Sequence, residues 1–489
     1  MKENNKFESE PMLHKNETHT LLPIRYIIVF MCFLAVTLNY ATRMTLSVAM
    51  LAMVPKGSMN LTSSNVSMTS DTSKHLTFDW SLETQQFILG SLYYGNTITP
   101  FFAGWLVGIF GGSPIILLGT LLMSLMMLLT PVAAEVGVWL LVITRIVDGM
   151  GQGFVYPATF NLITNWSKLN ERNTFISISA SGLGFGPVLA SYISASLCST
   201  DFLGGWPSTF YLFGVVGILW CIGWCIVGST DVNSNRWIST IERDSILFSQ
   251  TEEIKNASQY EVPWKKIAQS PVVWTLCFCT IGFNFGFIFL LTELPIFFET
   301  ILGFELKMTG LLSTIPHFVF FVAMLFGGVL ADALIFHKIL TAISTRKLLA
   351  CCALGISPMF LVSIGYVANN ETLAVVLMIC VFGMCPLYIP SVEASILDIA
   401  PNHSGLLIGI MSSASHVCGF IAPAIVGILT RNCNTIYQWR KMFWITAGVQ
   451  VLGLVTFMIF GTSEVQEWSK LDKSDTDEVV PCIESEKER

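Results

Sequence analysis

The sequence predicts an all-α membrane protein with twelve transmembrane helices arranged as two six-helix bundles. Hydrophobic residues make up 53% of the chain and charged residues only 12%, and the mean hydropathy is +0.64. A soluble protein of 489 residues cannot bury that much apolar surface. Long runs without Asp, Glu, Lys or Arg, and one long polar segment in the middle of the chain, complete the prediction.

Each helix is predicted from a run long enough to cross the bilayer, which takes roughly 20 apolar residues. The first run is broken only by Arg43, the second and third share the charge-free residues 84–134, and the fourth contains Arg145 and Asp148. The later runs carry no charge over 173–200, 202–230, 267–292, 308–331, 348–370, 372–392, 399–430 and 442–463. The helices are expected at 26–54, 82–108, 114–134, 138–163, 174–196, 208–228, 271–300, 309–335, 347–368, 373–397, 404–430 and 437–462.

Lysine and arginine predict the orientation, because cytosolic segments carry an excess of them. With the N-terminus inside, the inner segments hold eighteen of the 26 basic residues and the outer loops hold six. Residues 1–22 are polar and show no cleavable signal peptide, so the first helix is expected to act as the insertion signal. The first outer loop contains sequons at Asn60 and Asn65, which we expect to be glycosylated. Cys198 and Cys433 fall in outer loops, where pairing and free thiols both remain open.

A polar segment divides six predicted helices from six. The organisation expected is a cytosolic tail (1–24), a first bundle (25–228, with its glycosylated outer loop at 55–81), a cytosolic linker (229–270), a second bundle (271–462) and a cytosolic tail (463–489).

A weak internal repeat agrees with this division. Gly104 to Gly108 ends the second helix and Gly328 to Asp332 ends the eighth, so each motif ends the second helix of its half. Small residues at this spacing are common wherever membrane helices pack closely. In the fifth helix, Gly182, Gly186 and Pro187 predict a closely packed, flexible segment, which we assign to gating.

Two arginines inside apolar helices predict an anion site. A charge at mid-membrane costs at least about 2.5–3.5 kcal/mol on insertion scales, so it persists only with a partner or a water-filled path. A guanidinium stays protonated and its planar fork matches carboxylate or phosphate. Asn39, Tyr40 and Ser47 lie beside Arg43 on its helix, and Arg145 shares a face with Tyr156. We predict that Arg43, Arg145, Asn39, Tyr40, Ser47 and Tyr156 bind the substrate. The alternative for Arg145 is a structural ion pair with Asp148, three residues away.

Buried carboxylates are the candidates for coupling to a cation. In a low-dielectric setting a carboxylate is driven toward its neutral form, so its proton occupancy can follow access from either side. Asp148, Glu293 and Glu393 lie within or near predicted spans and are assigned to this role. Glu293 precedes Pro295, and a helix broken by proline exposes carbonyls that can also help to hold Na⁺.

Two further acids lie at the cytosolic ends of helices. We expect Asp332 to dock the inner gate against neighbouring backbone, and Asp398 to cap the tenth helix, which Pro401 ends.

Several segments make the chain resemble the anion:cation symporter family of the major facilitator superfamily, which includes sialin, the type I phosphate transporters and the vesicular glutamate transporters. The segments are 43–50, 145–157 with Asn165, Trp166, Glu171 and Arg172, 290–295, 310–316, 397–401 and 464–468. Residues 205–211 are similar to invertebrate members. The resemblance implies a major facilitator fold and favours substrate binding over a structural role for Arg145.

The chain also departs from the pattern of that family. Gln152 stands where the cytosolic end of the fourth helix often carries Glu, and Phe160 stands where it often carries His. Ser395 and Ile396 replace Asn and His or Gly ahead of the Leu-Asp-Ile-Ala-Pro segment. A coupling scheme that depends on that Glu and His therefore does not transfer to this chain.

The N-terminal tail contains an acidic dileucine pattern, Glu17 with Leu21 and Leu22, of the kind that clathrin adaptors bind. It predicts an endolysosomal or vesicular membrane, with the plasma membrane as the alternative.

Enzyme motifs are missing: the sequence has no P-loop, HExxH or GxSxG pattern, and its net charge of −7 disfavours a nucleic-acid partner. The predicted function is secondary active transport of a small anion, an organic acid such as sialic acid or an acidic amino acid, coupled to H⁺ or Na⁺ by alternating access. A Na⁺-coupled inorganic phosphate or urate transporter and an anion channel remain alternatives. We expect a monomer in the lipid bilayer, with no cofactor beyond the co-transported ion.

Overall fold

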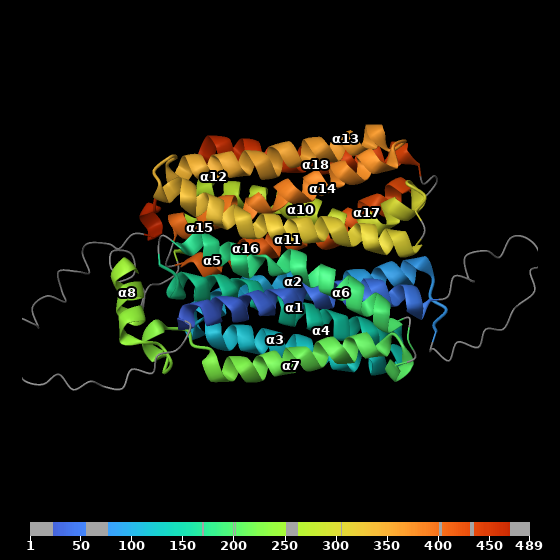
Figure 1. Cartoon of the computed structure of the whole chain (residues 1–489), viewed down its shortest axis with the longest axis horizontal. Helices are drawn as coiled ribbons and strands as arrows, with labels where there is room; N and C mark the ends of the chain where they lie inside the picture. The colour runs from blue at the N-terminus through green and yellow to red at the C-terminus, as the bar shows by residue number, and fades with distance from the viewer. Residues whose placement is uncertain are drawn as a thin grey trace, which may run out of the picture.

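The computed structural model describes residues 23–54, 77–168, 171–198, 200, 202–250, 263–304, 306–400, 403–430 and 435–469. All regular structure in these residues is helical. Figure 1 shows two layers of roughly antiparallel helices, with the N-terminal half of the chain (blue to green) on one side and the C-terminal half (yellow to red) on the other. The predicted two-bundle fold is confirmed.

Seven helices make up the N-terminal bundle, and two of them share one span. α5 and α6 are separated only by a break at Ser181, and together they form the fifth predicted span. The bounds are α1 (Ile24–Met53), α2 (Leu82–Phe110), α3 (Gly112–Val136), α4 (Val138–Trp166), α5 (Arg172–Ala180), α6 (Gly182–Cys198) and α7 (Pro207–Val227).

The C-terminal bundle is less regular, because three of its six spans are built from more than one helix. The helices of this bundle are α10 (Pro271–Thr300), α11 (Leu306–Phe336), α12 (Ala342–Cys351), η5 (Cys352–Ile356), α13 (Ser357–Val367), α14 (Glu371–Met384), η6 (Cys385–Tyr388), η7 (Ile389–Glu393), α15 (Ala394–Ile399), α16 (Ser404–His416), α17 (Cys418–Thr430) and α18 (Ile436–Phe460). In the tenth span, Pro386 and Pro390 lack the N–H that an α-helix needs, and the chain passes through a 3₁₀ turn and a π turn there. Glu393 ends the π turn, and such turns are frequent at functional sites.

Eleven of the twelve predicted spans are long and apolar enough to cross a membrane within the part of the chain that is described. The remaining one is α2, which is 29 residues long. Polar residues in its middle, including Asn96, Thr97 and Thr99, lower its hydropathy. α2 nevertheless packs along α4 of its own bundle and along α16 of the other bundle, so we count it as the twelfth transmembrane helix.

The two bundles meet along helices that carry the repeated glycine motifs. A Cβ on Gly104 of α2 would lie 2.6 Å from the Gly405 carbonyl oxygen of α16. A Cβ on Gly328 of α11 would lie 2.8 Å from the Asn173 carbonyl oxygen of α5. Both glycines therefore permit close contact between bundles, and they do so at equivalent places in the two halves.

At the end of the molecule that is predicted to face the cytosol, the linker helix α8 (Thr240–Gln250) closes onto the start of α1. Glu242 accepts hydrogen bonds from the backbone N–H groups of Ile24 (3.0 Å) and Arg25 (3.1 Å). A carboxylate at a helix N-terminus is stabilised by the unpaired N–H groups and the helix dipole.

The segment after α18 returns to the same end of the molecule. The Gln466 N–H donates to the Ile399 carbonyl oxygen at 2.9 Å, and the rings of Trp468 and His403 stack with centroids 6.4 Å apart. Burial lowers the pKa of His403, which keeps this ring neutral at pH 7.

Candidate functional site

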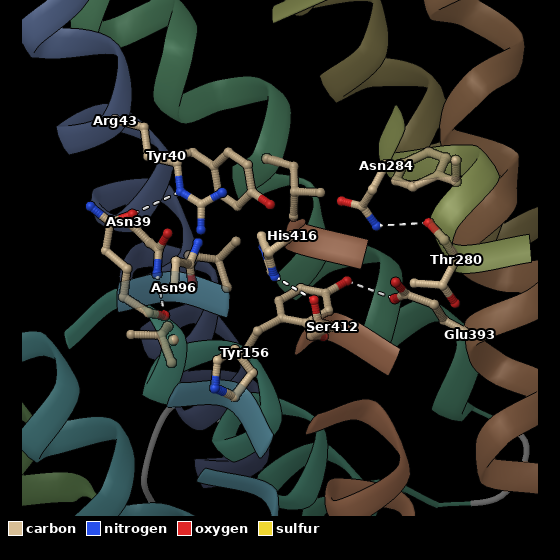
Figure 2. Close-up of a pocket in the computed structure, with 17 residues that line it drawn as sticks. Asn39, Tyr40, Arg43, Asn96, Tyr156, Thr280, Asn284, Glu393, Ser412 and His416 are labelled. Carbon is tan, nitrogen blue, oxygen red and sulfur yellow. Dashed lines mark hydrogen bonds between the residues drawn. The ribbon is translucent and has the colours of Figure 1, made fainter. Parts of the chain in front are cut away.

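A cavity with about 530 Å³ of empty space lies between the two bundles. It is lined by Val36, Asn39, Tyr40, Arg43, Asn96, Pro100, Gln152, Gly153, Val155, Tyr156 and Leu183 of the first bundle, and by Thr280, Phe283, Asn284, Glu393, Ser412 and His416 of the second. Figure 2 shows the polar side chains of the two bundles facing one another across it. A site that both bundles complete is accessible from one membrane side at a time when they rock.

Arg43 is the cationic group of the cavity. Its Nε donates to Gln152 Oε1 at 2.7 Å, and its guanidinium carbon lies 4.4 Å from the ring centroid of Tyr40. Among the described residues, neither of its Nη groups has a hydrogen-bond partner, although Arg43 is only 9% exposed. The guanidinium is thus held in place through Nε, and its two Nη groups remain available to donate hydrogen bonds to an anion.

Two asparagines on the same side add hydrogen-bonding capacity. Asn39 Nδ2 donates to the Gln152 carbonyl oxygen at 2.9 Å, whereas Asn39 Oδ1 has no partner in the described structure. Asn96 of α2 is fully buried, and both polar atoms of its side chain are likewise without one. Leaving a buried amide unsatisfied costs about 1–3 kcal/mol, which a bound polar ligand would recover. Asn96 was not predicted from the sequence, where it is one of several uncharged polar residues in the charge-free run 84–134.

Glu393 is the carboxylic acid of the cavity and lies on the opposite side from Arg43 (Figure 2). The Tyr156 hydroxyl of α4 donates to Glu393 Oε2 at 2.6 Å, so this bond joins the two bundles within the cavity. The other carboxylate oxygen has no partner among the described residues. The sequence predicted both residues, in different roles, but it did not predict that they bond to each other.

The second bundle adds two more polar side chains, Asn284 and His416, to which the sequence assigned no role. Asn284 Nδ2 donates to the Thr280 carbonyl oxygen at 3.1 Å, which leaves Asn284 Oδ1 as an acceptor. His416 Nδ1 lies 2.6 Å from the Ser412 carbonyl oxygen. Because a carbonyl only accepts, Nδ1 carries the proton, and Nε2 of a neutral ring is an acceptor.

Arg145 forms a buried ion pair instead of lining the cavity. Its Nη1 lies 2.7 Å from Asp148 Oδ2, and both side chains are almost fully buried. Gln152 Nε2 donates to the other carboxylate oxygen of Asp148 at 3.2 Å, while its Oε1 accepts from Arg43. The structural alternative for Arg145 therefore describes this conformation, and Gln152 connects the pair to the anion site.

Asp148→Asn should strongly destabilise the fold. The change leaves the buried guanidinium of Arg145 without a counter-charge, and breaking a buried ion pair in this way costs about 3–5 kcal/mol. We expect a clear drop in the thermal unfolding temperature of the purified protein in detergent. The control is Asp244→Asn, because that side chain is 67% exposed. An Asp148→Asn protein that melts with the wild type would contradict the structural role of the pair.

The remaining predicted membrane residues lie away from the cavity. Ser47 is partly exposed on α1 and is not among the lining residues. Glu293 is buried in α10, where the Thr292 hydroxyl lies 3.4 Å from its Oε1. Gly182 and Gly186 lie where α6 meets the backbone of α1: a Cβ on Gly186 would be 2.8 Å from the Ala41 nitrogen. With Pro187, inside α6, these glycines allow close packing, and their part in gating stays a prediction.

The two acids expected at the cytosolic ends of helices, Asp332 and Asp398, lie in one polar network. Asp332 accepts from Asn173 Nδ2 at 2.6 Å and from the Thr174 backbone N–H at 2.7 Å, so it binds the first turn of α5 across the bundle interface. Arg346 of α12 pairs with Asp398 (Nε to Oδ2, 3.1 Å) and donates to Asn173 Oδ1 at 2.8 Å. Asp398 therefore holds an arginine that also contacts the other bundle. The sequence predicted only that Asp398 caps its helix, and it did not predict this contact.

Asp332→Asn should loosen the cytosolic end. Charged hydrogen bonds are worth about 1.5–3 kcal/mol each, so losing them should raise the population open to the cytosol about tenfold. A cysteine introduced at Val155, which lines the cavity, should then react faster with a thiol reagent supplied on the cytosolic side. Glu371→Gln, at the exposed start of α14, serves as control. Equal labelling rates would show that Asp332 does not hold the gate.

Several predictions fall outside the described residues: glycosylation at Asn60 and Asn65, and the sorting residues Glu17, Leu21 and Leu22. Cys198 is a free cysteine, and Cys433 is outside the described part of the chain. Among the residues that were described, no group of three or more His, Cys, Asp or Glu side chains is placed to hold a metal ion.

Comparison with known proteins gives consistent matches over most of the chain. The sequence profile of the Major Facilitator Superfamily matches residues 32–344 and 333–484. Sialin of Homo sapiens is 30% identical over 92% of this chain and 91% of its own length. A putative inorganic phosphate cotransporter of Drosophila melanogaster is 30% identical over 94% of this chain and 88% of its own. The structure of the proton:xylose symporter XylE superposes with a TM-score of 0.69 at 15% identity, over 90% of this chain and 97% of that one, which supports the fold.

Proposed function

The chain belongs to the major facilitator superfamily, in the group that contains sialin and the phosphate cotransporters, and on that premise we propose that it carries a small organic anion together with a proton. It is a transporter and not an enzyme. The observation that carries the proposal is the open guanidinium fork of Arg43, buried in a cavity that both bundles complete.

Arg43 binds the carboxylate of the substrate. Its Nε is fixed by Gln152 and its plane lies over the Tyr40 ring, so little side-chain entropy is lost when a ligand binds the Nη groups. Asn96, whose amide is unsatisfied and buried, supplies further hydrogen bonds at the same end. The similar Drosophila protein is named for an anion, inorganic phosphate, in keeping with a cationic site.

Glu393 carries the proton. Arg43 and Glu393 are the charged residues that line the cavity, apart from the ionisable ring of His416. When Glu393 is ionised, its charge balances that of Arg43, and a bound monoanion then adds one uncompensated negative charge in a low-dielectric space. A proton on Glu393 restores neutrality, which couples one H⁺ to one monovalent anion.

The Tyr156–Glu393 hydrogen bond links proton binding to the movement of the bundles. Rocking the bundles apart at mid-membrane separates α4 from η7 and breaks this bond. The bond is strongest when Glu393 is ionised, because charged acceptors form stronger hydrogen bonds. Protonation therefore lowers the free energy needed to separate the bundles, so the loaded, protonated carrier reorients more readily than the deprotonated one.

The decisive experiment is uptake into proteoliposomes. The panel is sialic acid, glutamate, lactate, urate and inorganic phosphate, each under an imposed pH gradient and then under an imposed Na⁺ gradient. We expect saturable accumulation of at least one organic anion that depends on the pH gradient. Absence of gradient-dependent accumulation for every organic anion would refute the proposal.

Two alternatives give different results in this assay. The phosphate cotransporter similarity favours Na⁺-coupled phosphate or urate transport, which the same panel detects as Na⁺-driven phosphate or urate uptake. A channel would show flux that follows only the electrochemical gradient of the anion and does not saturate.

We propose an endolysosomal or vesicular membrane as the location, from the dileucine pattern in the N-terminal tail. Leu21→Ala together with Leu22→Ala should move a tagged protein to the cell surface, because the adaptor groove would lose two apolar anchors, each worth about 1.5–3 kcal/mol if fully buried. Surface biotinylation measures the change. A wild type already found mainly at the surface would contradict this location.

A further inference from the structure

The side of the cavity facing Arg43 is built for a cation. Glu393 has one carboxylate oxygen without a partner among the described residues, and Asn284 presents its carbonyl oxygen. His416, which lies between this side and Arg43 in Figure 2, adds Nε2 of its neutral ring as a third acceptor. All three are acceptors, and all three line the cavity (Figure 2).

An ammonium group matches this wall more closely than any anionic group does. It supplies three donors and one positive charge, and the wall supplies three acceptors, one of which carries a negative charge. The opposite wall, with the Nη groups of Arg43 and the amide of Asn96, matches a carboxylate. The cavity as a whole is therefore complementary to a molecule with a carboxylate at one end and an ammonium at the other.

We propose that this transporter also carries neutral amino acids as zwitterions, and that their ammonium group takes the place of the transported proton at Glu393. The inference rests on the proposed function, since it uses the same anion site and the same proton site. With a monoanion, Glu393 binds a proton in the loaded state and releases it with the substrate. With a zwitterion, Glu393 stays ionised throughout, and no proton enters or leaves with the substrate.

The groups around Glu393 allow this exchange. Those that interact electrostatically with it, or that face it across the cavity, are Tyr156 of α4, Tyr40 and Arg43 of α1, Tyr388 of η6 and His416 of α16. The tyrosines are neutral, and Arg43 is occupied by the substrate carboxylate. The ammonium of the ligand is thus the group that can balance the ionised Glu393.

Proteoliposomes containing the full-length protein and a pH indicator in the lumen test the inference. The probes are β-alanine, γ-aminobutyrate and δ-aminovalerate, which vary the distance between the two charges. Butyrate lacks the ammonium, and γ-butyrobetaine keeps the charge but has no N–H donor. We expect one chain length to be taken up best, without acidifying the lumen and without needing a pH gradient, whereas transported organic anions acidify it. The betaine should compete about tenfold more weakly than the best amino acid, because it forms no hydrogen bonds to the acceptor wall.

The variant test compares two substrates in the same vesicles. Glu393→Gln should lower uptake of the best zwitterion relative to anion exchange by about tenfold, because it removes the charged acceptor of the ammonium. The measurements on the wild-type protein remain informative even if the Glu393→Gln variant does not fold.

If organic anions are carried with protons but no amino acid competes or enters, the inference is wrong and the proposed function stands. Amino-acid uptake that acidifies the lumen also overturns the inference. If neither class is transported, the proposed function itself fails.

Discussion

Arg43→Lys is expected to reduce transport of organic anions at least about tenfold while leaving folding and membrane insertion intact. Lysine keeps the charge but loses the planar fork, and charged hydrogen bonds are worth about 1.5–3 kcal/mol each. It also loses the Nε–H that donates to Gln152 and the flat contact with the Tyr40 ring, so the charge is no longer held in position. Initial uptake rates in proteoliposomes, normalised to the amount of reconstituted protein, measure the effect.

A second arginine supplies a matched control. Arg440 of α18 also lies over a tyrosine ring, with its guanidinium carbon 4.7 Å from the centroid of Tyr366, but it is not among the cavity-lining residues. Arg440→Lys should therefore transport like the wild type. Normal transport by both Arg43→Lys and Arg43→Gln would remove Arg43 from the substrate site. The sequence predicted that Arg145 also binds the substrate, so Arg145→Lys is expected to reduce transport too. Because Arg145 forms a buried ion pair with Asp148, this variant is expected to be less stable as well.

Glu393→Gln is expected to abolish accumulation against a concentration gradient while anion-for-anion exchange continues. Glutamine has nearly the same shape as protonated glutamate, so the variant mimics the loaded carrier but cannot release the proton. Exchange needs no proton release, because a loaded carrier returns with another anion. The measurement is uptake driven by a pH gradient compared with counterflow into preloaded vesicles.

The other two carboxylates proposed for coupling distinguish this role from a general effect of lost charge. Glu293→Gln changes a buried acid of α10 that does not line the cavity, and it should still accumulate substrate. Asp148→Asn should lose stability, as described above. If Glu393→Gln accumulates substrate as the wild type does, the proton site lies elsewhere, and if only a Na⁺ gradient drives accumulation, the coupling ion is not H⁺.

The sequence alone predicted the membrane helices and the two-bundle organisation. A span is a local property, because the hydrocarbon core excludes charge over a length that roughly 20 residues must cover. Each predicted span therefore appears in the structure, including α2, which hydropathy alone would have missed. Local sequence did not reveal the turns in the tenth span, since Pro386 and Pro390 produce their 3₁₀ and π turns only in the packed helix.

The chemistry of single residues was also visible in the sequence. A charged side chain in an apolar run stands out because burying it is costly, and this drew attention to Arg43, Arg145, Asp148 and Glu393. Uncharged polar residues such as Asn96 and Asn284 did not stand out, because one amide in a long helix is as often a packing residue as a ligand group.

Only the tertiary structure decided which of these residues act together. Arg145 is neutralised by a partner three residues away, whereas Arg43 has no acidic residue in hydrogen-bond range within the described structure and faces an open cavity. Glu393 bonds to Tyr156, which lies 237 residues earlier in the chain. The sequence determined the fold because spanning helices follow from local hydrophobicity. The site was decided by packing, because a binding site depends on distances between side chains that sequence separation does not fix.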